Sequence, residues 1–121
     1  MTKVTRLARI GTGLTALMIV VLSIVPMRPH LLGNDYYEHL IAYFVTGSLF
    51  AVGYPRPAQL LSGAVLFAVC AGSLELAQWW IPGRTSSVGG FVSATIGAWI
   101  GLATTMLVRR IHERKFIVSY K

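Results

Sequence analysis

Four apolar segments, each close to the length that a helix needs to cross a membrane, constrain this chain more than any other feature. About 20 apolar residues in a helix span the hydrocarbon core of a bilayer. The segments are residues 10–25, 37–53, 60–81 and 88–108. Proline lies within two residues of the end of each of the first three. Because the connectors are short, we predict an all-α integral membrane protein with four transmembrane helices in an antiparallel bundle.

The composition excludes several classes of protein. The 121 residues are 55% hydrophobic and only 12% charged, whereas soluble domains carry about 25% charged residues. A soluble protein of this size has a large surface to cover, and eleven basic and four acidic residues are too few to cover it. A soluble enzyme, a nucleic-acid-binding domain and a disordered chain are therefore excluded. The length allows one domain, residues 1–121.

The distribution of basic residues predicts the orientation. Nine Lys and Arg residues lie in the N-terminal segment, the second connector and the tail at 109–121, whereas the other two connectors contain only Arg28 and Arg84. Cytoplasmic loops are enriched in Lys and Arg, so we expect both termini in the cytoplasm. No cleavage site followed by a soluble domain comes after the first apolar segment, so we expect it to be a retained helix.

Polar residues gather at the predicted outer ends of the helices. They come from the start of the second helix, the end of the third helix and the connector to the fourth. Polar groups inside a membrane are costly, so their convergence on one face predicts a pocket that opens outward. The predicted ligand-binding residues are Asp35, His39, Tyr43, Glu75, Gln78 and Arg84.

Helical spacing supports this pocket. Asp35, His39 and Tyr43 follow one another at four-residue intervals, which aligns them along one face of the second helix. Glu75 and Gln78 are three residues apart and share a face of the third helix. We therefore expect the two faces to approach each other at the outer end.

Glu75 is the most deeply placed carboxyl group. It precedes Ile81 by six residues, or about 9 Å along a helix. A carboxyl group at that depth is expected to be protonated or paired, and the partners within reach are Arg84 and His39. Two structural interpretations stay open. A Glu75–Arg84 pair can serve only to fasten the third helix to its connector, and His39 can be a hydrogen-bonded histidine at the interface.

The fourth helix has a face of small residues. Gly89, Ser93, Gly97 and Gly101 recur at every fourth position. Such faces let helix backbones approach closely in lipid. We predict that this face packs the fourth helix against the third. The alternatives are a homodimer or a contact with a larger membrane-protein complex.

Four short motifs occur in a characteristic order. They are D-x-x-x-H-x-x-x-Y from Asp35, E-x-x-Q from Glu75, P-G-R-T-x-S from Pro82 and T-I-G-A from Thr95. With them, residues 35–101 resemble the VanZ-like family of small bacterial membrane proteins, named for a protein associated with low-level teicoplanin resistance. The chain departs from the family pattern at Tyr36, Gly90 and Ala94, where members commonly have Lys, Asp and Asn.

The resemblance implies a multi-pass protein of the bacterial inner membrane with a role in the cell envelope. An outward pocket would recognise a lipid headgroup, an envelope precursor or a glycopeptide, with Arg84 holding an anionic group. The alternative is an accessory or scaffolding subunit that packs against a larger membrane complex through its small-residue faces. A hydrolase that uses Glu75 and His39 is a third hypothesis, but the sequence contains no nucleophile elbow, metal-ligand set or phosphate-binding loop. We expect no cofactor, metal or nucleic-acid partner, and contacts with membrane lipids.

Overall fold

The computed structural model of the chain describes residues 1–26 and 33–121, and its regular structure in these ranges is entirely helical. The predicted all-α fold is confirmed. Arg28, which contributes to the predicted orientation, lies outside the described residues. The helices are α1 (Lys3–Ile24), α2 (Asp35–Gly53), α3 (Pro57–Gln78) and α4 (Val88–Ser119).

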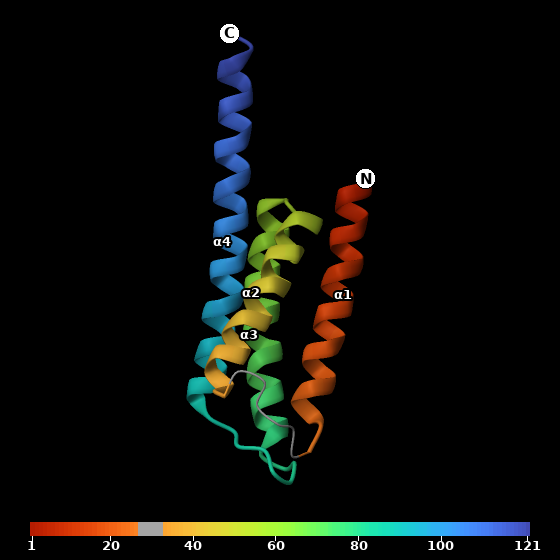
Figure 1. Cartoon of the computed structure of the whole chain (residues 1–121), viewed down its shortest axis with the longest axis vertical. Coiled ribbons are helices and arrows are strands. Elements are labelled where there is room, and N and C mark those ends of the chain that lie inside the picture. The colour runs from red at the N-terminus through yellow and green to blue at the C-terminus, as the bar shows by residue number, and fades with distance from the viewer. Residues whose placement is uncertain (27–32) are drawn as a thin grey trace.

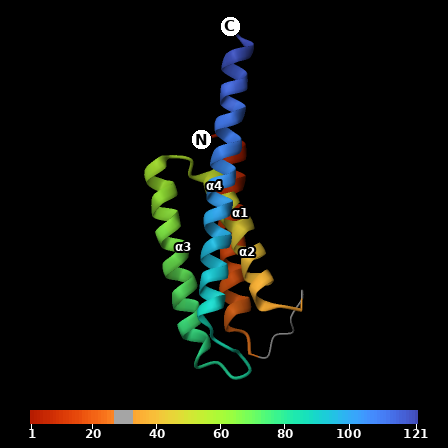
Figure 2. The ribbon, with the colours of Figure 1, turned by 90° about the vertical axis from the view of Figure 1, so that its left-hand side faces the viewer.

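The helices form an elongated bundle in which successive helices run in opposite directions (Figure 1). Both termini and the connector between α2 and α3 lie toward one end of the bundle, here called the terminal end. The connector formed by residues 79–87 lies at the opposite end, here called the connector end. α2 packs most extensively against α4 and next against α1, whereas α3 packs mainly on α4. Figure 2 shows α3 on the far side of α4 from α2.

Local hydrogen bonds explain where the helices begin. Thr2, Asn34 and Ser87 each accept a hydrogen bond from a backbone N–H group in the first turn of the helix that follows. α3 begins at Pro57, whose missing N–H group would have no partner at a first helical position. Gly83 has a φ of 76°, a left-handed conformation that glycine adopts readily, in the turn after α3.

The helices extend beyond some of the predicted boundaries. α4 continues past Val108, through Arg109 and Arg110, to Ser119, so the predicted basic tail is mostly helical. α1 likewise begins at Lys3, ahead of its apolar segment. Hydropathy marks only the apolar part of a helix, whereas the backbone hydrogen bonds continue into the polar flanks. At its other end, α3 stops at Gln78, three residues before the predicted limit of 81.

Three of these helices, α1, α3 and α4, are long and apolar enough to cross a membrane. Their outward faces expose large apolar side chains, among them Leu14, Leu17, Leu61 and Val65. Such faces are typical of helices that contact lipid. α2 is not in this set, and it carries the polar residues Asp35, Glu38 and His39 at its start.

The small-residue face of α4 packs against α2, and not against the third helix as predicted. A Cβ atom added at Gly97 would overlap the backbone oxygen of Leu40, and one at Gly101 would overlap that of Phe44. Ser93, which lies between Gly89 and Gly97 on the same face, is half-buried. Helix backbones that approach so closely leave no room for a side chain, which is the physical reason for the glycines.

Candidate functional site

Glu75 joins three helices at the connector end. Its Oε1 atom lies 3.2 Å from Nε2 of His39 on α2. Its Oε2 atom accepts a hydrogen bond of 3.0 Å from the backbone N–H of Ser87, the N-cap residue of α4. The partly positive N-terminus of a helix favours a carboxylate at this position. The side chains of His39 and Glu75 are only 14% and 9% exposed, so the pair is largely sealed from its surroundings.

His39 is held in place from both sides of its ring. Its Nδ1 atom is hydrogen-bonded to the backbone oxygen of Asp35, at 2.7 Å. The rings of His39 and Tyr43 are nearly parallel, with an interplanar angle of 4°. The predicted face of Asp35, His39 and Tyr43 is thus formed, although Asp35 contributes its backbone oxygen to His39. The pair with Glu75 therefore uses a histidine whose orientation is fixed.

Gln78 lies away from the Glu75–His39 pair. Its side chain is buried, with 1% exposed, and its Nε2 atom donates a hydrogen bond of 3.1 Å to the backbone oxygen of Ser23 on α1. Ser23 is in the last turn of α1, where carbonyl groups have no partner within the helix. Gln78 therefore connects α3 to the end of α1 and does not take its predicted place beside Glu75.

Replacing Gln78 with leucine is expected to destabilise the fold by about 1–3 kcal/mol. The substitution keeps the side-chain volume but leaves the carbonyl of Ser23 without its buried donor. Unfolding by SDS in mixed micelles, followed by far-UV circular dichroism, measures the effect. Gln59→Leu is the comparison and should cost less, because Gln59 is half-buried and makes only a solvent-exposed capping hydrogen bond with the backbone N–H of Arg56. Equal stability of the two variants would contradict the role given to Gln78.

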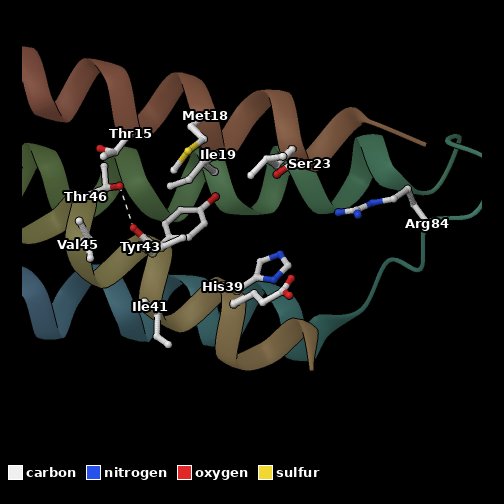
Figure 3. Close-up of a pocket in the computed structure, with 13 residues that line it drawn as sticks. Thr15, Met18, Ile19, Ser23, His39, Ile41, Tyr43, Val45, Thr46 and Arg84 are labelled. Atoms are coloured by element: carbon white, nitrogen blue, oxygen red, sulfur yellow. Dashed lines mark hydrogen bonds between the residues drawn. The ribbon is translucent and has the colours of Figure 1, made fainter. Parts of the chain in front are cut away.

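A groove of about 390 Å³ lies between α1 and α2 (Figure 3). Its walls are mostly apolar, and its charged side chains, Arg84 and Glu38, line the mouth at the connector end together with His39. The apolar wall is formed by Met18, Ile19, Leu22, Ile41, Ala42 and Val45. The volume is in the range of small-molecule sites, which are commonly about 300–1,000 Å³.

Arg84 reaches this groove from the connector between α3 and α4 (Figure 3). The predicted Glu75–Arg84 pair is not formed, because Glu75 contacts His39 and Ser87. Arg84 attracts Glu75 only through space. The backbone N–H of Arg84 donates to the backbone oxygen of Ile81, but its guanidinium group has no hydrogen-bond or ion-pair partner among the residues that the structure describes. A guanidinium group is thus available to a ligand at the mouth.

Tyr43 forms part of the groove at a deeper level. The residue is 4% exposed, and its ring packs edge-on against Phe67 with ring centroids 6.4 Å apart. The side chain points toward α1 (Figure 3). Its hydroxyl makes no hydrogen bond to any residue within 1–26 or 33–121. The groove therefore contains a hydroxyl group to which the described residues give no hydrogen-bond partner.

The two positions of α4 that depart from the VanZ-like pattern are tightly packed. A Cβ atom at Gly90 would lie 2.5 Å from Oε1 of Glu75, so a larger residue would displace the carboxyl group. Ala94, one turn later, is buried in the core. The backbone contact of Ser87 with Glu75 was not predicted, because the sequence does not reveal which backbone groups a carboxylate meets.

Comparison with known proteins gave no match among family models, curated proteins or solved structures. Within the described part of the chain, no three His, Cys, Asp or Glu residues are grouped so that they could hold a metal ion. A function for this chain is therefore inferred from the groove and from the Glu75–His39 pair.

Proposed function

We propose that this chain is a small VanZ-like protein of the bacterial inner membrane that binds the headgroup of a membrane lipid in the groove between α1 and α2. In this proposal all four helices span the membrane and both termini are cytoplasmic. The excess of Lys and Arg in residues 1–9, at Arg56 and in residues 109–121 supports this orientation. The connector end, with Arg84 and the mouth of the groove, then faces the outside.

The availability of Arg84 is the observation that carries this proposal. A guanidinium group without a partner among the described residues lies at the mouth of a groove that is otherwise mostly apolar. Arginine binds phosphate and carboxylate through two parallel hydrogen bonds. A ligand that combines an anionic group with an apolar part fits both features, and membrane lipids have this combination.

The dimensions favour a lipid over the other ligands suggested by the sequence. A groove of about 390 Å³ accommodates a headgroup with part of a hydrocarbon chain, but not the whole of a glycopeptide. The scaffolding alternative is less favoured, because it relied on the face that contains Gly97 and Gly101. That face is covered by α2 within the same chain.

Replacing Arg84 with glutamine is expected to weaken the binding of an anionic phospholipid at least about tenfold. A hydrogen bond to a charged group contributes about 1.5–3 kcal/mol, and 1.4 kcal/mol corresponds to a factor of ten in the dissociation constant. The measurement is native mass spectrometry of the full chain in mild detergent, titrated with dioleoylphosphatidylglycerol. Dioleoylglycerol, which lacks the phosphate, should bind the two proteins equally.

The matched control is Arg110→Gln, which removes the same charge from the opposite end of α4. It should leave the binding of phosphatidylglycerol unchanged. If both variants lost the same affinity for phosphatidylglycerol, Arg84 would act only through the net charge of the protein, and the proposal would be overturned.

A further inference from the structure

The groove offers two hydrogen-bond donors at two depths. Arg84 lies at the mouth, and the hydroxyl of Tyr43 lies further in (Figure 3). A ligand that satisfies both donors therefore needs an anionic group and, deeper in the groove, a neutral hydrogen-bond acceptor.

The inner part of the groove is chemically apolar, although two threonines line it. The hydroxyl of Thr15 donates to the backbone oxygen of Gly11, and that of Thr46 donates to the backbone oxygen of Ala42. With these donors engaged inside their own helices, the remaining surface there consists mainly of aliphatic side chains, such as Met18. The inner part suits a hydrocarbon chain.

We propose that the ligand is a diacyl glycerophospholipid whose phosphate binds Arg84 and whose acyl ester carbonyl accepts a hydrogen bond from Tyr43. This inference rests on the proposed function and names the class of lipid. From the mouth inward, such a lipid presents a phosphate, a glycerol backbone, an ester and an acyl chain. The groove presents an arginine, a hydroxyl group and an apolar wall in the same order (Figure 3).

The hydroxyl of Tyr43 supports this assignment. The residue lines the groove and is 4% exposed, and its hydroxyl makes no hydrogen bond within the described residues. A lipid bound in the groove would enclose this hydroxyl, and an ester carbonyl would supply it with an acceptor. A polyprenyl phosphate would match Arg84 but carries no acceptor below its phosphate. The two lipid classes therefore differ in whether they offer Tyr43 a hydrogen-bond acceptor.

Phosphatidylglycerol is a suitable probe, because it combines an anionic phosphate with acyl ester carbonyls.

The first experiment compares two lipids on the unaltered protein. The full chain in mild detergent is titrated by native mass spectrometry with dioleoylphosphatidylglycerol and with its ether-linked analogue, which lacks both carbonyl oxygens. We expect the ester lipid to bind about 2- to 10-fold more tightly, the ratio expected for one ordinary hydrogen bond. This comparison does not depend on whether any variant folds.

The second experiment tests whether Tyr43 causes that preference. Tyr43→Phe removes only the hydroxyl. The affinity for the ester lipid should fall to that for the ether lipid, and the affinity for the ether lipid should not change. Tyr37→Phe is the matched control, because Tyr37 is an exposed tyrosine of the same helix. Thermal unfolding of each variant confirms that it is folded before it is titrated.

The outcomes separate this inference from the proposed function. If binding requires Arg84 but a polyprenyl phosphate binds as tightly as the ester lipid, or Tyr43→Phe leaves the ester preference intact, the ligand class is wrong and the lipid site remains. If glycerol phosphate alone competes as well as the lipid, the acyl chain has no place in the groove and the inference fails. If Arg84→Gln changes no lipid's binding, the proposed function itself fails.

Discussion

Replacing Gly97 with alanine is expected to separate α2 from α4 and to destabilise the fold by about 1–3 kcal/mol, with a larger loss for Gly97→Leu. The added Cβ atom would overlap the backbone oxygen of Leu40. A flexible side chain can move aside, but a helix backbone moves only if the whole interface opens. Because His39 lies on α2 and Ser87 caps α4, lipid binding should fall together with stability.

Gly13 of α1 is the matched control for Gly97. No atom lies within 4 Å of a Cβ atom placed there. Gly13→Ala should therefore be neutral or stabilising by up to about 1 kcal/mol, because alanine is the better helix former. Unfolding in mixed micelles containing SDS measures both variants. If Gly97→Ala is as stable as Gly13→Ala, the close contact between α2 and α4 does not exist.

Replacing Glu75 with alanine is the second change for which we expect a large effect, a destabilisation of about 2–4 kcal/mol. The substitution leaves Nε2 of His39 and the N–H of Ser87 without their common partner. Removing one member of a buried polar pair is costly, because the other member stays buried and unpaired. Glu75→Gln should cost less, since an amide oxygen still accepts a hydrogen bond.

A double-mutant cycle isolates the contact between Glu75 and His39. The effects of Glu75→Ala and His39→Ala should not add, and the coupling free energy should be about 0.5–3 kcal/mol. Glu113→Gln is the control, because Glu113 faces Arg109 across 3.9 Å in an exposed pair on α4, and such pairs contribute little. Additive effects at Glu75 and His39 would mean that the two side chains do not interact.

The sequence predicted the polar cluster correctly where the relative positions of the side chains depend on a single helix. The four-residue spacing of Asp35, His39 and Tyr43 predicted a common face, and these residues do line up on α2. Gln78 shows the limit of this reasoning. Three residues rotate a helix by about 300°, so Gln78 points about 60° away from Glu75. That difference is enough to direct it to α1.

Contacts between segments were harder to predict, because they depend on the paths of connectors. Both Arg84 and His39 were within reach of Glu75 by depth alone, and only the placement of residues 79–87 leaves His39 as the partner. The glycine face of α4 is similar. Periodicity identifies a face that permits close approach, but it does not identify which helix fills that face. Here α2 fills it.

The uninterrupted course of α4 has a mechanical consequence. A helix of 32 residues is about 48 Å long, and α4 carries the N-cap that contacts Glu75 at one end and the basic residues at the other. It contains no proline between Val88 and Ser119. Such a rod behaves as a lever, so a tilt of about 5° at Ser87 displaces the far end by about 4 Å. A tilt of α4 caused by a rearrangement around Glu75 would therefore move the basic segment at the opposite end of the molecule.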